Sequence, residues 1–375
     1  MLSNRTNVRK KIRVLVVDDQ STVRTILQRG LSADAEIEIV GWANDAYSAR
    51  DRIVQLEPDV VTLDVEMPRM SGLEFLRRLM PQYPLPVIMV SSLTGNGQSA
   101  TFEALEAGAV DFVCKPQGGP GDLEAMLEEL RSKVKVAAKI DRNKLRKTKS
   151  PVKSGNVKNG TTDASKKSLP GSIDLVAIGA STGGTLAVRE LLSQLPEEMP
   201  GMIIVQHMPA GFTAMFAENL RRLTHFNVTE AKHGDSIQPG MILIAPGDRH
   251  VTVKRKLGMY NVFLSSTEKV QGHRPSVDVL LDSVANEAGS KAIGVLLTGM
   301  GSDGAKGLLR LRASGGRTIG QDEASSVVYG MPRVAFQIGA VEFQRSLDDI
   351  PGAILQIING ELAANDQAKA SNNKD

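Results

Sequence analysis

Residues 176–185, VAIGASTGGT, join an apolar run to a glycine-rich turn and then to a segment with helical spacing. A strand, a tight turn and a helix in this order are the building unit of an α/β fold. The serine at the centre of the turn, Ser181, leaves three interpretations open. It belongs to a variant of a phosphate-binding loop, it caps the helix, or it is a nucleophile presented on a sharp turn.

The dinucleotide-binding interpretation is disfavoured by two departures from its pattern. Such a loop needs a glycine at the position of Ser181, so that the backbone can approach the pyrophosphate, and an acidic residue about 20 residues later. Here the next apolar run, IIVQH, ends in Gln206 and His207 instead. We therefore expect no nucleotide cofactor at this segment.

The nucleophile interpretation needs a base and an orienting acid, and the sequence offers both. Residues 179–183 read G-x-S-x-G, and His207 and Asp303 each follow a predicted strand. The carboxyl ends of parallel strands meet at one edge of a sheet, so these side chains are expected to converge. We predict Ser181 as nucleophile, His207 as general base and acid, and Asp303 as the group that orients the imidazole. The order Ser, His, Asp differs from that of α/β-hydrolases.

Two backbone N–H groups are candidates for stabilising an oxyanion, those of Thr182 at the helix start and of Met300 in the segment TGMGSDG. Among the other histidines, His273 and His250 remain alternative contributors to the site. The remaining two lie in polar surroundings and are expected at the surface.

The N-terminal third shows five short apolar runs separated by segments with helical spacing, at residues 12–17, 37–43, 60–64, 86–91 and 109–115. This alternation predicts a doubly wound parallel sheet of five strands. Asp18 and Asp19 end the first strand, Asp64 the third, Ser91 the fourth and Lys115 the fifth. Carboxylates that converge in one crevice repel one another, and Mg²⁺ is the cation that such oxygen ligands favour.

This N-terminal region resembles the receiver domain of bacterial response regulators, through VLVVDD, VTLDVEMPRMSGLEFL, PVIMVSS and AGAVDFVCKP. The resemblance implies that a histidine kinase phosphorylates Asp64. It also implies that Asp19, Asp64 and the backbone carbonyl of Glu66 surround Mg²⁺. Asp18, Ser91 and Lys115 would then serve phosphorylation and signalling.

A second alternation of strands and helices begins near residue 173, and we expect an α/β open-sheet domain. Its predicted strands are 173–179, 202–206, 241–245, 259–264 and 291–297, and its predicted helices are 182–195, 211–223, 276–288 and 304–313. The expected division of the chain is a receiver domain over 1–135, a basic flexible linker over 136–171, a catalytic domain over 172–365 and a polar tail over 366–375.

Composition excludes several classes of protein. No run of about 18 apolar residues is present, and the N-terminus lacks the apolar centre of a signal peptide, so we expect a cytoplasmic chain without membrane insertion. The single cysteine, Cys114, is expected in the core. Residues 131–170 hold thirteen Lys or Arg and two Asp, but no aromatic residues accompany the charge, which disfavours nucleic acid as a partner.

The C-terminal region resembles the catalytic domain of the chemotaxis protein-glutamate methylesterases, through IGASTGGT, IVQHMP, GHRPSVDVL, LLTGMGSDGA and QDEASSVVYGMP. The resemblance implies phosphorylation-activated hydrolysis of glutamate methyl esters on chemoreceptors, with release of methanol, and deamidation of receptor glutamines. We expect no cofactor for the esterase step and a chain that acts as a monomer. The alternative is a non-catalytic response regulator whose C-terminal domain is a binding module.

Overall fold

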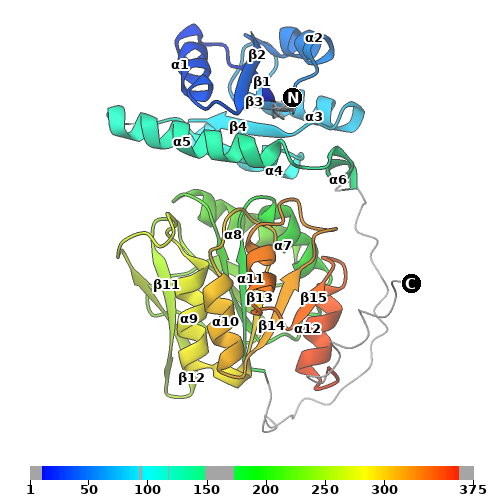
Figure 1. The fold of residues 1–375 in the computed structure, drawn as a ribbon. Coiled ribbons are helices and arrows are strands. Elements are labelled where there is room, and N and C mark those ends of the chain that lie inside the picture. Colours follow the sequence, from blue (N-terminus) through cyan, green and yellow to red (C-terminus); the bar gives the residue numbers. More distant parts are fainter. Residues whose placement is uncertain (1–10, 93–94, 117, 148–172, 363–375) are drawn as a thin grey trace, which may run out of the picture. The chain divides into compact units, whose positions relative to one another are not determined.

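The computed structural model describes residues 11–92, 95–116, 118–147 and 173–362, and the chain divides into two compact units, residues 1–149 and 150–375 (Figure 1). The polar tail and most of the basic segment lie outside the described residues. Within the described residues, no helix is both long and apolar enough to cross a membrane.

The first unit alternates strands with helices along the chain. Its elements are β1 Ile12–Val17, α1 Ser21–Ser32, β2 Ile37–Ala43, α2 Ala46–Leu56, β3 Val60–Asp64, α3 Gly72–Gln82, β4 Val87–Ser91, α4 Gly95–Glu106, β5 Asp111–Cys114, α5 Pro120–Ala137 and α6 Arg142–Lys147. The strands form one parallel sheet in the order β2-β1-β3-β4-β5, which confirms the predicted doubly wound fold. In the sheet, β1 lies between β2 and β3. The chain therefore reverses its direction of travel across the sheet between β1 and β3, which is the topological switch point.

Local sequence explains where these elements begin. The β3 and β4 strands are buried along their whole length, as expected of parallel strands with helices on both faces. Asp45 caps α2 by accepting a hydrogen bond from the Ser48 N–H at 2.8 Å, and Ser71 caps α3 in the same way.

Helix α6 differs from the sequence prediction, which expected a flexible linker over 136–171. Leu145 of α6 is buried, and the guanidinium of Arg142 donates to the carbonyl of Pro58 at 2.9 Å. A helix of six residues with one apolar anchor shows less than two turns of periodicity, which is too short a pattern to recognise in a basic sequence.

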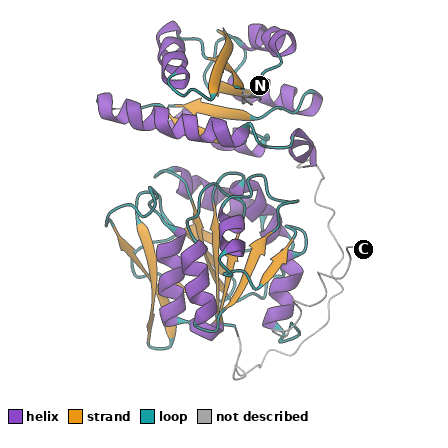
Figure 2. Ribbon diagram, in the orientation of Figure 1, coloured by secondary structure: helices purple, strands orange, loops and turns teal. Residues whose placement is uncertain are grey.

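The second unit contains two sheets (Figure 2). Its elements are β6 Leu175–Ala180, α7 Gly184–Ser193, β7 Gly201–Gln206, α8 Phe212–Leu223, β8 Asn227–Glu230, β9 Ser236–Ile237, β10 Met241–Ile244, β11 His250–Lys256, β12 Met259–Ser265, α9 Val277–Glu287, the 3₁₀ turn Gly289–Lys291, β13 Ala292–Leu296, α10 Ala305–Ala313, β14 Arg317–Gln321, α11 Met331–Gln337, β15 Phe343–Arg345 and α12 Ile350–Ile358.

Seven parallel strands form the main sheet, in the order β15-β14-β13-β6-β7-β10-β8. The predicted open α/β sheet is confirmed, and the predicted strands 173–179, 202–206, 241–245 and 291–297 agree with β6, β7, β10 and β13 to within a few residues. The predicted strand 259–264 is present as β12, but it belongs to a second sheet. β11, β12 and β9 form a separate antiparallel sheet. Since β6 lies between β7 and β13, the chain reverses its direction of travel across the sheet there. A crevice at the carboxyl ends of these strands is where open α/β sheets place their sites.

Candidate functional site

Three chain segments meet at the carboxyl end of β6. Ser181 directly follows β6, His207 directly follows β7, and Asp303 lies in the loop between β13 and α10. Backbone hydrogen bonds join these segments, from the Ser181 N–H to the Thr298 carbonyl at 3.0 Å and from the His207 N–H to the Ala180 carbonyl at 3.1 Å. The structure therefore brings together the three residues that the sequence predicted as a triad.

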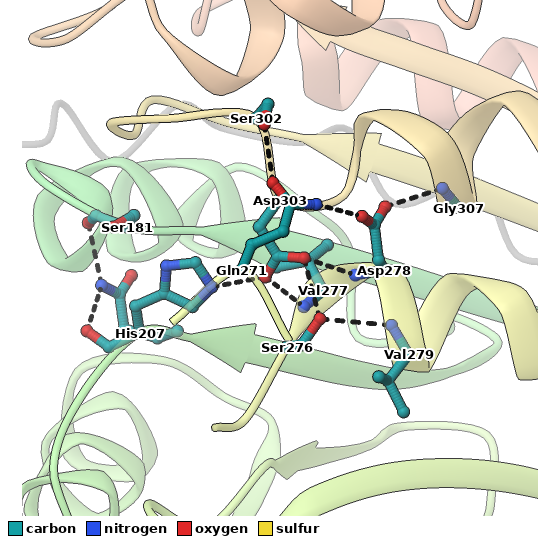
Figure 3. A network of polar contacts seen from close by, with 11 residues as sticks. Ser181, His207, Gln271, Ser276, Val277, Asp278, Val279, Ser302, Asp303 and Gly307 are labelled. Carbon is teal, nitrogen blue, oxygen red and sulfur yellow. Dashed lines mark hydrogen bonds and ion pairs between the residues drawn. The ribbon is translucent and has the colours of Figure 1, made fainter. Parts of the chain in front are cut away.

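Asp303 holds one side of the His207 imidazole. Its Oδ2 lies 2.8 Å from His207 Nε2, and both residues are almost completely buried. The same carboxylate accepts hydrogen bonds from the Ser276 hydroxyl at 2.8 Å, the Val277 N–H at 2.7 Å and the Asp278 N–H at 3.0 Å (Figure 3). Burial acts to raise the pKa of Asp303, but the hydrogen bond and charge of His207 and the backbone donors outweigh it and lower that pKa. Asp303 is thus an ionised acceptor for an Nε2–H.

The other imidazole nitrogen faces the serine. Nδ1 of His207 is buried and has no hydrogen-bond partner among the described residues. Figure 3 shows the Ser181 side chain on the side of the ring opposite Asp303. With Nε2 carrying the proton, Nδ1 has the free lone pair that a general base needs. No Ser181–His207 hydrogen bond is present in the described part of the chain, and such bonds are often formed only with substrate bound.

Ser181 does not cap the helix that follows it. The N-cap of α7 is Gly183, with φ of 76°, a left-handed conformation that glycine adopts without strain. The Ser181 carbonyl accepts from the Gly184 N–H at 2.7 Å and from the Gln206 side-chain amide at 2.8 Å. These bonds fix the turn through its backbone and leave the hydroxyl uninvolved, so the helix-cap interpretation is wrong.

The loop after β13 packs directly against the serine. A Cβ placed on Gly299 would lie 2.7 Å from the Cβ of Ser181, so only glycine allows this approach. The preceding residue, Thr298, donates its hydroxyl to the Thr182 carbonyl at 3.0 Å. Thr182 and Met300, whose N–H groups the sequence predicted as oxyanion donors, are therefore on the two segments that flank Ser181.

His273 joins the site, whereas His250 does not. The His273 ring stacks on that of His207, with centroids 3.8 Å apart and planes 10° from parallel. His273 is carried by a tight turn closed by two backbone hydrogen bonds with Val270. His250 is completely buried, and its Nε2 lies 2.9 Å from the Glu268 carbonyl oxygen, a contact outside the network of Figure 3.

Sequence reasoning missed the side chains that surround Asp303. Ser276 caps α9 and also binds Asp303, and Gln271 bridges two loops. Its amide nitrogen donates to Asp278 at 2.6 Å, and its amide oxygen accepts from the Ser302 hydroxyl at 2.6 Å. The serine before a helical pattern signals the cap, but no local pattern signals the contacts of Ser276 with Asp303 and of Gln271 with Ser302, which join residues 27 and 31 positions apart.

The first unit carries an acidic cluster at its own switch point. Ligand oxygens of Asp18, Asp19 and Asp64 lie within 4.8 Å of one another. The Lys115 ammonium lies 2.9 Å from both Asp18 and Asp64. Burial raises the pKa of Asp64 to about 6, and Asp18 adds to the rise, while Lys115 acts against it. A divalent cation with oxygen ligands would relieve this repulsion, so the residues present fit Mg²⁺.

Ser91 ends β4, as the sequence predicted, and Glu66 lies in the loop after β3. Ser91 is completely buried at the end of β4, and its hydroxyl accepts from Thr101 at 2.5 Å. A backbone hydrogen bond from Glu66 reaches the Asp64 carboxylate, while the Glu66 side chain is exposed. The structure thus places Glu66 in the loop that borders the Asp64 carboxylate.

Comparison with known proteins matches both units to families. Residues 14–128 match the response regulator receiver domain, and residues 176–354 match the CheB methylesterase family. The chain is 52% identical to the "Protein-glutamate methylesterase/protein-glutamine glutaminase" of Syntrophotalea carbinolica, over 93% of this chain and 98% of the relative. The protein of the same name from Sulfurimonas denitrificans is 51% identical over 93% and 99% of the two chains.

Among solved structures, the CheB methylesterase catalytic domain of Thermotoga maritima is 37% identical, covering 50% of this chain and 99% of its own, with a TM-score of 0.49. The two family matches follow one another in the same order as the two structural units. On the identity and coverage of the full-length relatives, the chain belongs to the family of chemotaxis response regulators that are protein-glutamate methylesterases and protein-glutamine glutaminases.

Proposed function

We propose that this chain is a phosphorylation-activated serine hydrolase that acts on chemoreceptors. It hydrolyses glutamate methyl esters with release of methanol, and it deamidates glutamines to glutamate. The observation that carries the proposal is the state of His207. Asp303 holds its Nε2, while the buried Nδ1, on the side of Ser181, has no hydrogen-bond partner in the part of the chain that the structure describes. An imidazole protonated on Nε2 has its lone pair on Nδ1, so His207 can take a proton from Ser181.

The esterase step follows from these positions. Ser181 Oγ attacks the carbonyl carbon of the substrate, and its proton moves to Nδ1 of His207. The imidazolium that forms is stabilised by the ionised Asp303. The N–H groups of Thr182 and Met300 donate hydrogen bonds to the substrate oxygen and stabilise its negative charge.

Breakdown of the tetrahedral intermediate uses the same proton. His207 Nδ1 returns it to the leaving methoxide, which departs as methanol, or to the amide nitrogen of a glutamine, which departs as ammonia. Water then attacks the acyl-enzyme, again with Nδ1 as the base, and releases glutamate and free Ser181. No cofactor is required in either half of this cycle.

The first unit receives the activating signal. Asp64 takes a phosphoryl group from the phosphohistidine of a histidine kinase, and Lys115 and Ser91 bind the transferred oxygens. Mg²⁺, when bound, would neutralise charge on the phosphoryl group. The carboxylates of Asp19 and Asp64 and the Glu66 carbonyl would hold the ion.

The remaining features of the proposal concern organisation. Residues 1–135 act as the receiver and residues 172–365 as the hydrolase, joined through the basic segment 136–171 and followed by the polar tail 366–375. The chain works in the cytoplasm as a monomer, with chemoreceptors as substrates and a histidine kinase as phosphodonor.

Mass spectrometry of receptor peptides tests the substrate class. Methylated receptor membranes are incubated with the full chain, with and without a small phosphodonor. The expected products are peptides in which glutamate methyl esters and selected glutamines have become glutamate, formed faster with the phosphodonor. Receptor peptides left unchanged under both conditions would refute the proposed activity, and the chain would then be a binding module.

A further inference from the structure

Arg24 connects helix α1 to the acidic cluster. Its guanidinium turns back over the helix start, where one nitrogen, Nη1, donates to the Asp18 carbonyl at 2.8 Å and to the Asp19 carbonyl at 2.9 Å. A cation near the N-terminus of a helix opposes the helix dipole. Helix stability therefore does not explain this placement, whereas fixing the backbone of the Asp18–Asp19 turn does.

Trp42, the single tryptophan of the chain, supports the Arg24 guanidinium. The Arg24 Cζ lies 4.8 Å from the centroid of the indole. Trp42 stands near the end of β2, and the next residue, Ala43, accepts a hydrogen bond from the Asp18 N–H at 3.2 Å. A guanidinium stacked on an aromatic face is already oriented before it donates, so less freedom is lost when its hydrogen bonds form.

The three acids are not held equally. The Asp18 carboxylate accepts from Lys115 and from the Gln20 N–H, and Asp64 is held by Lys115 and a backbone donor. The carboxylate of Asp19 is exposed, and no hydrogen bond reaches it from the rest of the described chain. Its direction is thus set through its own peptide backbone, which is the part that Arg24 holds.

We propose that Arg24, supported by Trp42, is a positioning residue that orients Asp19 for binding Mg²⁺. The inference rests on the proposed metal-dependent phosphorylation of the first unit. Arg24 of α1 and Trp42 of β2 thus help to form the metal site, although neither side chain is a ligand of the ion.

A purely electrostatic role would have the opposite sign. The Arg24 cation repels a divalent cation bound at the neighbouring acidic cluster, so removal of the Arg24 charge alone would tighten Mg²⁺ binding. Loss of orientation would weaken it, because residues that orient metal ligands typically change affinity about 10-fold or more when they are replaced. The direction of the change therefore distinguishes the two roles.

Titration calorimetry of the full chain with Mg²⁺ measures this direction. We expect Arg24→Ala to bind about 10-fold more weakly than the wild type. Arg52→Ala is the matched control, because the Arg52 Cζ lies 6.0 Å from the same indole and the described structure shows no hydrogen bond from it to the turn. It should bind like the wild type. An affinity of Arg24→Ala equal to or tighter than that of the wild type would overturn the inference.

Two more variants separate the possible failures. Trp42→Leu keeps the guanidinium but removes its support, and we expect weaker binding in the same direction; unchanged binding would overturn the role of Trp42. Asp19→Asn should abolish the binding heat. If that heat persists, Mg²⁺ is bound elsewhere, and the proposed metal site fails together with the inference. We expect the thermal unfolding midpoint without Mg²⁺ to be the same in the wild type and all variants. A change in Mg²⁺ affinity then reports the orientation of Asp19 and not a loss of folding.

Discussion

Replacement of Asp303 by asparagine perturbs the proposed catalytic network without changing its volume. The carboxylate serves four donors with two oxygens, His207 and Val277 on Oδ2 and Ser276 and Asp278 on Oδ1. An amide has only one acceptor oxygen. In either orientation its NH₂ group faces a backbone N–H, so one buried donor loses its partner at a cost of about 1–3 kcal/mol in unfolding free energy.

The effect on catalysis is larger than the effect on stability. If the amide NH₂ faces His207, Nε2 must accept and the proton moves to Nδ1, where it blocks proton transfer from Ser181. If the amide oxygen faces His207, the negative charge that stabilises the imidazolium is still missing. We expect kcat for methanol release to fall about 10³–10⁴-fold, equivalent to about 4–5.5 kcal/mol in activation free energy. A kcat within about 10-fold of the wild type would refute the role of Asp303.

Asp278→Asn is the matched control for this experiment. Asp278 is a buried carboxylate of the same network, but it does not contact the imidazole. Its oxygens accept from the Gly307 N–H at 2.7 Å and from Gln271. If Gln271 turns its amide over, it can accept from the new asparagine and donate to Ser302, so the contacts of Gln271 are retained. A backbone hydrogen bond from Gly304 also reaches the Asp278 carboxylate, so any loss on substitution falls on this bond and not on the imidazole. We expect nearly wild-type kcat for this variant in the same assay.

The lowered pKa of Asp303 also predicts how stability depends on pH. Because its folded-state pKa lies below the ordinary value of 3.8, its stabilising contribution is complete above that value and is lost as the pH falls through the folded-state pKa. The difference in unfolding free energy between the wild type and Asp303→Asn should therefore shrink in acid. Urea unfolding at about pH 7 and about pH 3 measures it, and a difference that grows in acid would contradict the assignment.

Three further outcomes are expected. Asp64→Asn should make the rate of methanol release independent of a small phosphodonor, and retained stimulation would place the acceptor elsewhere. Burial, with Glu129, raises the pKa of the Cys114 thiol to about 12, so iodoacetamide at about pH 8 should label the native chain about 10³-fold more slowly than the unfolded chain; equal rates would show an accessible thiolate. Thr298→Val removes the hydroxyl that binds the Thr182 carbonyl, and we expect it to lower kcat about 10- to 100-fold at unchanged KM. Thr298→Ser should restore kcat. A change in KM alone would contradict a role of Thr298 in positioning.

The sequence predicted the parallel sheets well because their strands are buried on both faces. Continuous runs such as VLVV and IIV, each followed by helical spacing, leave few alternative folds. The predicted convergence of side chains at the strand ends has the same origin, since sheet order brings the carboxyl ends of neighbouring strands together. Ser181, His207 and Asp303 were selected by that rule together with the G-x-S-x-G pattern and the residue types that a nucleophile, a base and an orienting acid require.

The remainder depended on contacts that no local pattern records. β11 and β12 form a hairpin around Leu257 and Gly258, which both have positive φ. Leucine rarely adopts positive φ, so the sequence does not predict this turn. Stacking of His273 on His207 likewise depends on the turn at Gln271, which has φ of 50°. Short elements after residue 313 pack through tertiary contacts, and the sequence analysis predicted none of them.

Methanol release from methylated receptor membranes by the wild type and by Ser181→Ala tests the central claim most directly. Ser193→Ala, a serine at the end of α7 and away from the network, is the control for the substitution itself. The account predicts release by the wild type and by Ser193→Ala, faster with a small phosphodonor, and none by Ser181→Ala above the uncatalysed rate. Release by Ser181→Ala as fast as by the wild type would contradict the nucleophile.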